Sequence, residues 1–439
     1  MAWPTPLTSL TCCGGQRSSS TRTGSPPSSA LSRDAAVDDV VDLSLNGTPT
    51  MDAYLLSEDA ADGWGQYVYA CNWWVQQFTT VARPLQEKLT LFWHGHFTSA
   101  WYEIHKGFQM MPQNQLFRLN ALGNLRTLTQ SVALDPAMLV YLSNADNVKG
   151  QPNQNFAREL MELFTLGVGN YTEDDVAIAA RAWTGYNYDR TTLRYVYRDD
   201  RHDATPGTFF GVTQAWTGPQ VVDAIFDRKG SVVAAFIARK LWEFFAYVGP
   251  AQGIVDDLAA VLVASGFELK PLLTALFKRP EFYSDQAKQG LVRSPIEYVV
   301  ALSAASGISG KDLGVAWRLE STGQRMYMPP NVSGWKPNGA WLNGCALSGR
   351  AGFADNVAWR LADGTAHDDL ATGSLNATNA AAAVDKAAAL LGLTSASGRT
   401  LSDVTRQALT AWWQTESSSY WRKRNLMMLM LTSPEMNLA

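Results

Sequence analysis

Apolar side chains recur at helical spacing along most of this chain, and this periodicity restricts its fold more than any other feature. Segments such as ARPLQEKLTLFWHGHFTSAW and NQNFARELMELFTLGVG place apolar residues every three or four positions and end near Gly, Pro or Asn. In YTEDDVAIAARAWTGY, Thr172 is a candidate helix N-cap with Asp175 three residues on, close to a capping box. By contrast, LRYVYRDD followed by GTFFGV shows strand-like alternation. The sequence therefore predicts an all-α fold, one large multi-helix domain with a minor β-hairpin near residues 193–211.

Composition divides the 439 residues into four parts. Residues 31–362 carry the main helical pattern, residues 363–399 hold a low-complexity insertion or linker plus a short helix, and residues 400–439 hold C-terminal helices that we expect to pack on the main domain. Residues 1–30 are rich in Ser, Thr, Pro and Gly, which is typical of disorder. The alternative is that this segment is translated in the wrong reading frame. If codons for TCCGGQRS are read with a shift of one base, they encode His-Leu-Leu-Arg-Arg-Ser-Ala-Phe, a credible start of an amphipathic helix.

Charge and hydropathy argue against a nucleic-acid partner and against a transmembrane segment. The chain has 36 Lys and Arg against 40 Asp and Glu, and its cations are scattered rather than gathered into a basic patch, so we expect no nucleic-acid partner. Long apolar runs such as VVAAFIARKLWEFFAYV are interrupted by Arg239, Lys240 and Glu243, so we expect no transmembrane segment. No export signal is visible as written, but the doubtful N-terminal segment leaves the compartment open.

Two of the five histidines lie two residues apart in LFWHGHF, among aromatic and aliphatic side chains. On an α-helix this separation is about 200°, so His94 and His96 are expected on opposite sides. They cannot easily share one metal ion unless the helix is distorted, for which Gly95 between them offers a place. Three interpretations remain open: a metal ligand, a proton-transfer group, or two histidines that fill the core.

A polar strip is predicted on the helix NQNFARELMELF. Its members are separated by three or four residues and therefore share one helical face; they are Asn155, Arg158, Glu159 and Glu162. Paired helical carboxylates with histidines from neighbouring helices are the ligands of metal sites inside helical bundles. The alternative is an ion pair between Arg158 and Glu162 that stabilises a structural helix.

Two loops carry further candidates. His202 and Asp203 are adjacent in RDDRHDATPG and could supply a ligand with a supporting carboxylate, or a general base. Trp335 and Trp341 in PPNVSGWKPNGAW could stack on a sugar or another planar ligand, with nearby Asn side chains as hydrogen-bonding groups. The alternative for this second loop is a rigid cap packed on helices.

Several blocks of the chain, in this order, together resemble a large bacterial family known only as domain of unknown function number 1800. The resemblance covers roughly residues 30–439, and its blocks are KLTLFWHGHFTSA, QNQLFRLNALGNLRTL, DPAMLVYLSNADNVKGQPNQNFARELMELFTLGVGNYTEDDVAIAARAWTGY, FIARKLWEFF, RSPIEYVV and GQRMYMPPNVSGWKPNGAWLN. It implies no established reaction, cofactor or mechanism. It does imply a pattern of polar positions, which here are His94, His96, Asn153, Asn155, Arg158, Glu159, His202, Asp203 and the loop 329–335.

The chain departs from the family pattern in three places. Gln154 stands where the family usually shows Glu, and Gly207 stands where Lys is common, so each departure removes a charge near the expected site. Near the N-terminus, relatives resemble His-Leu-Leu-Arg-Arg, which is what the shifted frame spells. This last likeness favours the out-of-frame interpretation of residues 1–30.

Together these features predict a metal-dependent enzyme, a hydrolase first and an enzyme of oxygen chemistry second, with a His/Glu site inside the helical domain. Donors of this kind suit a divalent metal such as Zn, Mn or Fe. The expected metal ligands are His94, His96 and His202, the catalytic group is Glu159, Glu162, Arg158 and Asp203, and the binding group is Asn153, Asn155, Trp335 and Trp341. The alternative is a non-catalytic binding or structural protein, whose polar strip is a buried network and whose Pro/Trp loop contacts a protein partner or a glycan.

Overall fold

The structure is a computed structural model, and it describes residues 31–57, 63–192, 194–362, 379–395 and 399–439. The predictions made for residues 1–30, and for most of the low-complexity stretch, concern residues outside these ranges. Within the described residues, no helix is both long enough and apolar enough to cross a membrane.

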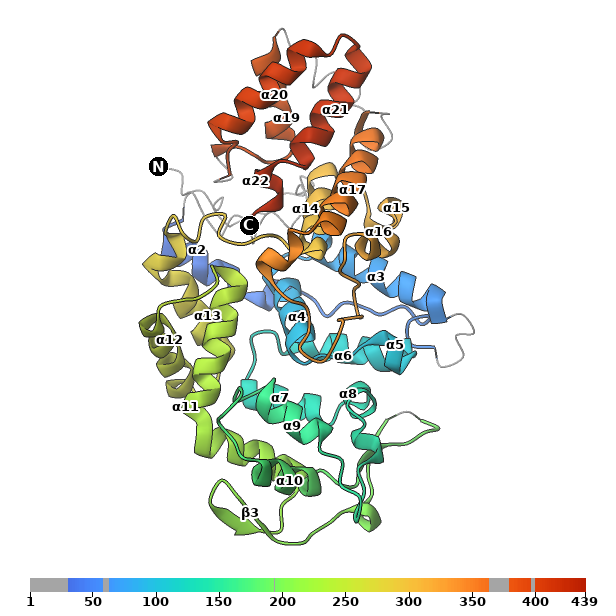
Figure 1. Cartoon of the computed structure of the whole chain (residues 1–439), viewed down its shortest axis with the longest axis vertical. Coiled ribbons are helices and arrows are strands. Elements are labelled where there is room, and N and C mark those ends of the chain that lie inside the picture. Colours follow the sequence, from blue (N-terminus) through green and yellow to red (C-terminus); the bar gives the residue numbers. More distant parts are fainter. Residues whose placement is uncertain (1–30, 58–62, 193, 363–378, 396–398) are drawn as a thin grey trace.

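The fold is mainly α, as predicted (Figure 1). The helices are α2 (Arg33–Val40), α3 (Gly63–Thr80), α4 (Leu85–His96), α5 (Trp101–Ile104), α6 (Gly107–Leu119), α7 (Leu125–Ala133), α8 (Pro136–Tyr141), α9 (Asn155–Glu162), α10 (Glu173–Ala182), α11 (Gly218–Phe245), α12 (Gln252–Ala264), α13 (Leu269–Lys278), α14 (Pro295–Ser306), α15 (Gly310–Leu313), α16 (Val315–Ser321), α17 (Gly344–Ala362), α19 (Ala380–Leu390), α20 (Asp403–Thr415), α21 (Ser419–Leu431) and α22 (Pro434–Asn437).

The minor β content is confirmed, but it forms two hairpins rather than one. β1 (Tyr186–Tyr188) pairs antiparallel with β2 (Tyr195–Tyr197), and β3 (Gly207–Phe209) pairs antiparallel with β4 (Val212–Gln214). The two segments expected to pair with each other thus each pair with a neighbour closer in sequence. A short loop joins each pair, and closing a short loop costs less conformational entropy than closing a long one.

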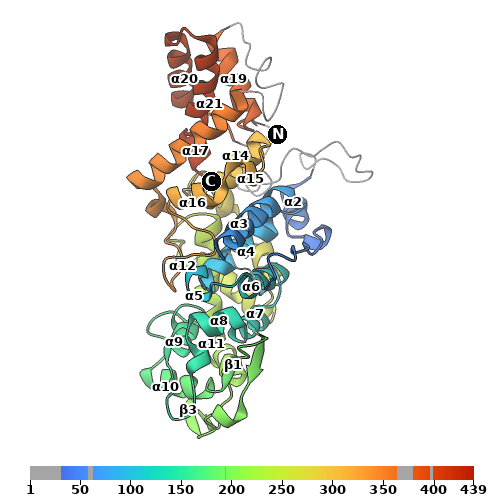
Figure 2. The ribbon, with the colours of Figure 1, turned by 90° about the vertical axis from the view of Figure 1, so that its right-hand side faces the viewer.

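Two hydrophobic cores lie on either side of α4. One core takes Phe92 and Trp93 of this helix and gathers side chains from α2 and from α6 to α13. The other core takes Leu91 and gathers side chains from α3 and from α14 to α22. Figures 1 and 2 show the result, an elongated molecule with α4 near the middle, α9 and α10 towards one end, and α19 to α21 at the other.

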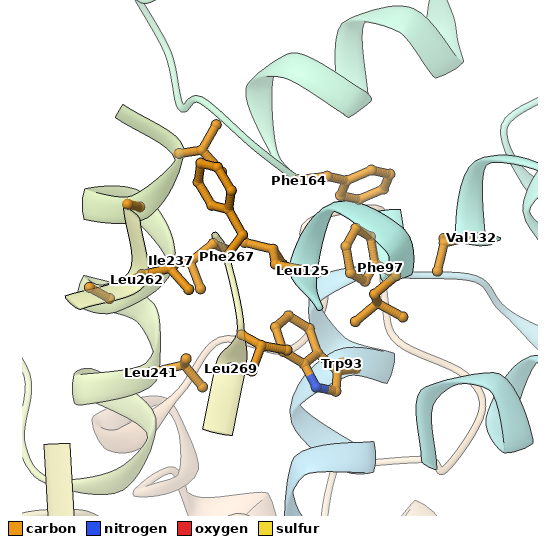
Figure 3. Close-up of a cluster of buried hydrophobic side chains, with 14 of the residues drawn as sticks. Trp93, Phe97, Leu125, Val132, Phe164, Ile237, Leu241, Leu262, Phe267 and Leu269 are labelled. Atoms are coloured by element: carbon orange, nitrogen blue, oxygen red, sulfur yellow. The ribbon is translucent and has the colours of Figure 1, made fainter. Parts of the chain in front are cut away.

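The first core is built from aromatic and branched aliphatic side chains. Figure 3 shows Trp93 of α4 and Phe97, which follows it, among Leu125, Phe164 and Leu269. In the second core, α21 packs on α17 and α22 packs on α14, so the last helices of the chain lie against the helices before residue 363.

A buried ion pair joins the helices around α4. The Arg118 guanidinium of α6 donates to both oxygens of Glu87 of α4, at 2.6 and 2.8 Å, and both side chains are fully excluded from solvent. Trp74 of α3 donates its indole N–H to the same carboxylate at 2.9 Å. The Arg118 guanidinium also lies 5.0 Å from the ring centroid of Trp73. Three helices therefore meet at one carboxylate, whose oxygens are satisfied by donors from both neighbours.

Removing one partner of this pair should strongly destabilise the fold. An Arg118→Met substitution leaves the Glu87 carboxylate without a counter-ion in a dry interior, which typically costs about 3–5 kcal/mol of unfolding free energy. The matched control is Lys288→Met, which removes a cation from the exposed pair with Asp285 and should cost less than about 1 kcal/mol. Urea unfolding followed by circular dichroism measures both, and equal losses in the two variants would contradict a central role for the buried pair.

Candidate functional site

The two histidines of α4 lie on opposite sides of the helix, as the spacing predicts. His94 is 1% exposed and lies among aromatic rings, with centroid distances of 5.5 Å to Trp335, 5.7 Å to Trp74 and 5.7 Å to Tyr327. Its Nε2 is buried without a hydrogen-bond partner, and burial lowers the pKa of this histidine to about 3. His94 is therefore a neutral ring that packs in the interior.

Both ring nitrogens of His96 are engaged by other groups. Its Nε2 lies 3.0 Å from the carbonyl oxygen of Phe164, and its Nδ1 lies 2.8 Å from Nζ of Lys240. A carbonyl only accepts, so Nε2 must carry the hydrogen, and Nδ1 is then the acceptor for Lys240. Burial, followed by the nearby charge of Lys240, holds the pKa of His96 well below its usual value. This arrangement leaves His96 neutral and without a free lone pair for a metal ion.

His96 and Lys240 line a pocket of about 230 Å³, which we call the α4–α11 pocket. Four other parts of the chain complete it: the segment 291–297 that leads into α14, the side chain of Gln324, the loop 333–341, and Ala439. Its aromatic side chains are Phe92, Phe244, Trp335 and Trp341, and its polar side chains include His96, Lys240, Glu243, Glu297, Gln324 and Asn338. The pocket therefore lies where the two hydrophobic cores meet beside α4.

Each charged side chain that lines the α4–α11 pocket has a group of opposite charge nearby. Burial lowers the pKa of Lys240 to about 8, against the opposing attraction of Glu243 one turn later. Burial raises the pKa of Glu297, but the ammonium of Lys88 at 3.1 Å and the backbone N–H of Ser294 at 2.8 Å outweigh it, so the net shift is downward. Glu297 is thus ionised and paired, and the pocket as a whole carries little net charge.

The Pro/Trp loop closes one side of the pocket by packing on Gly95. A Cβ atom on Gly95 would lie 3.6 Å from the Trp335 ring, and one on Gly334 would lie 2.2 Å from the Gly95 carbonyl oxygen. Gly334 also has a φ of +78°, in the left-handed region that favours glycine. Gly95 therefore does not distort α4, which continues through His96; it provides a bare patch of helix on which the loop rests.

The polar strip of α9 lies on a different part of the molecule. Arg158 donates to both oxygens of Glu173 at 2.8 and 2.7 Å, so the alternative pairing of Arg158 with Glu162 does not form. Glu162 instead accepts from the Tyr171 hydroxyl at 2.5 Å. Glu159 is half-buried, and burial followed by the charge of Glu162 raises its pKa. Asn155 is exposed.

The remaining predicted residues in this part of the chain form hydrogen bonds with the backbone. The side chain of Asn153 accepts from the backbone N–H of Asn155 at 2.9 Å. The carboxylate of Asp203 accepts from Thr205 at 3.0 Å, and hydrogen bonds from this residue lower its pKa. His202 places Nδ1 at 3.0 Å from the carbonyl oxygen of Thr184. The contacts of Asn153 and Asp203 stabilise local backbone, whereas His202 joins two segments 18 residues apart.

The structure brings only part of the predicted site together. His96, Trp335 and Trp341 line one pocket, whereas the α9 strip and the His202–Asp203 pair lie elsewhere. Across the described ranges, no three His, Cys, Asp or Glu side chains gather closely enough to hold a metal ion. The metal-dependent enzyme predicted from the sequence stays a prediction.

Three residues of the α4–α11 pocket were missed in the sequence, although signals for them exist. Lys240 and Glu243 are spaced i,i+3 within the largely apolar block FIARKLWEFF, where two opposite charges on one helical face are unusual. Glu297 follows Ser294 by three residues in RSPIEYVV and forms a capping box with it. A charge inside an apolar helix is the stronger signal of the two, because its burial needs a partner.

The fold and pocket define a predominantly α-helical protein with a mixed aromatic and charged pocket between α4 and α11. A family model described as "Protein of unknown function (DUF1800)" matches residues 18–438. The chain belongs to this family. Neither the comparison with curated proteins nor that with solved structures gave a match.

A methyl group on Gly334 should displace the loop and open the pocket. The Gly334→Ala variant would place Cβ against the Gly95 carbonyl and impose a left-handed φ on alanine, so we expect a loss of roughly 1–3 kcal/mol in unfolding free energy. The matched control is Gly339→Ala in the same loop, where a Cβ meets nothing within 4 Å. Urea unfolding and tryptophan fluorescence measure both variants; a Gly334→Ala variant as stable as Gly339→Ala would contradict this packing.

Proposed function

We propose that this protein binds a small neutral polyhydroxylated ligand, about one sugar ring in size, in the α4–α11 pocket. The observation that carries the proposal is that Trp335 and Trp341 line the same pocket as the carboxylates of Glu243 and Glu297. Indole rings offer flat apolar faces to the C–H groups of a sugar, while carboxylates accept hydrogen bonds from its hydroxyls. This is the binding function that the Pro/Trp loop suggested in the sequence.

The size and shape of the pocket support a ligand of this class. Its volume of about 230 Å³ lies a little below the roughly 300–1,000 Å³ of pockets for drug-sized molecules. A predominantly apolar lining with a few placed polar groups is the usual character of such sites. Here the polar groups come from both helices and loops, so they can contact a ligand from several directions.

The charges favour a neutral ligand over an anionic one. Lys88 neutralises Glu297, and Lys240 is accompanied by Glu243, so no group of unpaired cations is present in the pocket to hold a phosphate or a sulfate. An anion would have to lie near two carboxylates, which costs electrostatic free energy in a partly desolvated site. Neutral hydroxyls accept and donate hydrogen bonds without this cost.

Calorimetric titration with a panel of neutral monosaccharides tests the proposal. We expect at least one of glucose, galactose, mannose and N-acetylglucosamine to bind and to change the tryptophan fluorescence. Glu243→Gln should weaken this binding about 10- to 100-fold, because it removes a charged hydrogen-bond acceptor. The matched control is Glu103→Gln, an exposed carboxylate on α5 outside the pocket, which should bind as the unmodified chain does.

Two results would overturn the proposed function. One is that no sugar in the panel binds or perturbs the fluorescence. The other is that a sugar binds with equal affinity to the unmodified chain and to the Glu243→Gln variant, which would place the binding site elsewhere.

A further inference from the structure

We propose that the amine of Lys240 is a nucleophile that forms an imine with the carbonyl carbon of a hydroxyaldehyde bound in the α4–α11 pocket. The inference rests on the proposed function for its ligand class, since the open-chain form of an aldose is a polyhydroxylated aldehyde. It adds a covalent reaction to what would otherwise be a binding pocket.

The hydrogen bond between Lys240 and His96 orients the amine for this reaction. The Phe164 carbonyl requires a hydrogen on Nε2 of His96, so Nδ1 presents a lone pair to Nζ of Lys240 at 2.8 Å. An amine that donates one hydrogen to Nδ1 keeps its own lone pair free. His96 therefore acts as a positioning residue that holds Nζ by one of its hydrogens.

The surroundings of Lys240 raise the fraction of its amine that is neutral and nucleophilic. The pocket beside its Nζ is lined in part by the rings of Phe92 and Phe244. Burial strips water from the ammonium form and lowers the pKa of Lys240 to about 8, although the charge of Glu243 acts in the opposite direction. The side chain is nevertheless only half-buried and lines the pocket, so a small aldehyde can reach it.

Lys88, the ion-pair partner of the pocket residue Glu297, is engaged differently. Lys88 lies 3.1 Å from the ionised carboxylate of Glu297 and over the rings of Phe244 and Phe245, contacts that stabilise its ammonium form. A protonated amine has no lone pair for attack. Lys240, whose hydrogen-bond partner is a neutral acceptor, is thus the amine suited to react.

The reaction needs no reagent beyond the amine and the aldehyde. The Nζ lone pair forms a bond to the carbonyl carbon, and the C=O π electrons move to oxygen, which takes a proton to give a carbinolamine. The C–O bond then breaks, the oxygen leaves as water with both hydrogens that nitrogen has given up, and a C=N bond remains. Water reverses the sequence, so the imine is a reversible intermediate.

Reductive trapping with a small probe tests the proposal on the full chain. The protein is treated at pH 7 with limiting glycolaldehyde and sodium cyanoborohydride. Peptide mass spectrometry then identifies each labelled lysine and measures its rate of labelling. We expect Lys240 to be labelled at least roughly 10-fold faster than Lys336 and Lys311, two exposed lysines, because the neutral amine fraction at this pH is far larger for an amine of lowered pKa. Lys336 is the matched control, since it lies in the loop beside the pocket.

A variant distinguishes an oriented amine from an accessible one. In His96→Gln, whose folding is checked by circular dichroism, we expect the preference for Lys240 over Lys336 to fall at least threefold. Labelling of Lys240 no faster than Lys336 in the unmodified chain would overturn the proposal. The labelling result is independent of the sugar titration. If Lys240 is labelled selectively but no sugar binds, the proposed ligand class is wrong and the imine stands. If a sugar binds but Lys240 is not labelled selectively, the imine is wrong and the ligand class stands.

Discussion

The bidentate ion pair between Glu87 and Arg118 is the interaction on which the rest of the structure depends. It lies inside the molecule with no solvent contact, and it ties α4 to α6 while the indole of Trp74 ties the same carboxylate to α3. A buried ion pair of this kind adds little net stability over an apolar replacement, but it is costly to break from one side. Its geometric effect is large, because it sets the rotation of α4 about its own axis between two hydrophobic cores.

The rotation of α4 determines the surroundings of His94 and His96. With Glu87 directed at Arg118, His94 lies among Trp74, Tyr327 and Trp335, where its Nε2 has no hydrogen-bond partner. His96 lies on the other side of the helix, against Phe164 and Lys240. One histidine thus fills space and the other completes a polar network at the pocket. The Pro/Trp loop rests on Gly95 between them and forms part of the pocket wall.

The sequence predicts the helical fold because that prediction depends on local periodicity. The capping box of Thr172 and Asp175 and the opposite directions of His94 and His96 could likewise be predicted, since both follow from the geometry of a single helix. The pairing of the strands was only partly predicted, because turn residues show where a chain reverses but not which segment it meets. Local patterns were sufficient wherever the interacting groups lie within a few residues of one another.

The candidate site needed contacts that no local pattern encodes. Lys240 meets His96 across 144 residues, and Lys88 meets Glu297 across more than two hundred. Arg158 could be placed on a helical face from the sequence, but its choice of Glu173 over Glu162 depends on how α10 packs on α9. The family blocks were quoted as separate strings, and only the fold shows that four of them supply one pocket.

The most direct test of this account is the protonation of His96, because the tautomer follows from the packing of α4 and underlies the role given to Lys240. A long-range ¹⁵N–¹H correlation spectrum of the uniformly labelled protein, with the His96 signal assigned from its loss in His96→Gln, reports each ring nitrogen separately. We expect a neutral ring with hydrogen on Nε2 and none on Nδ1 from pH 8 down to pH 5, since burial holds the pKa of His96 well below its usual value. A doubly protonated ring within this range, or hydrogen on Nδ1, would contradict it.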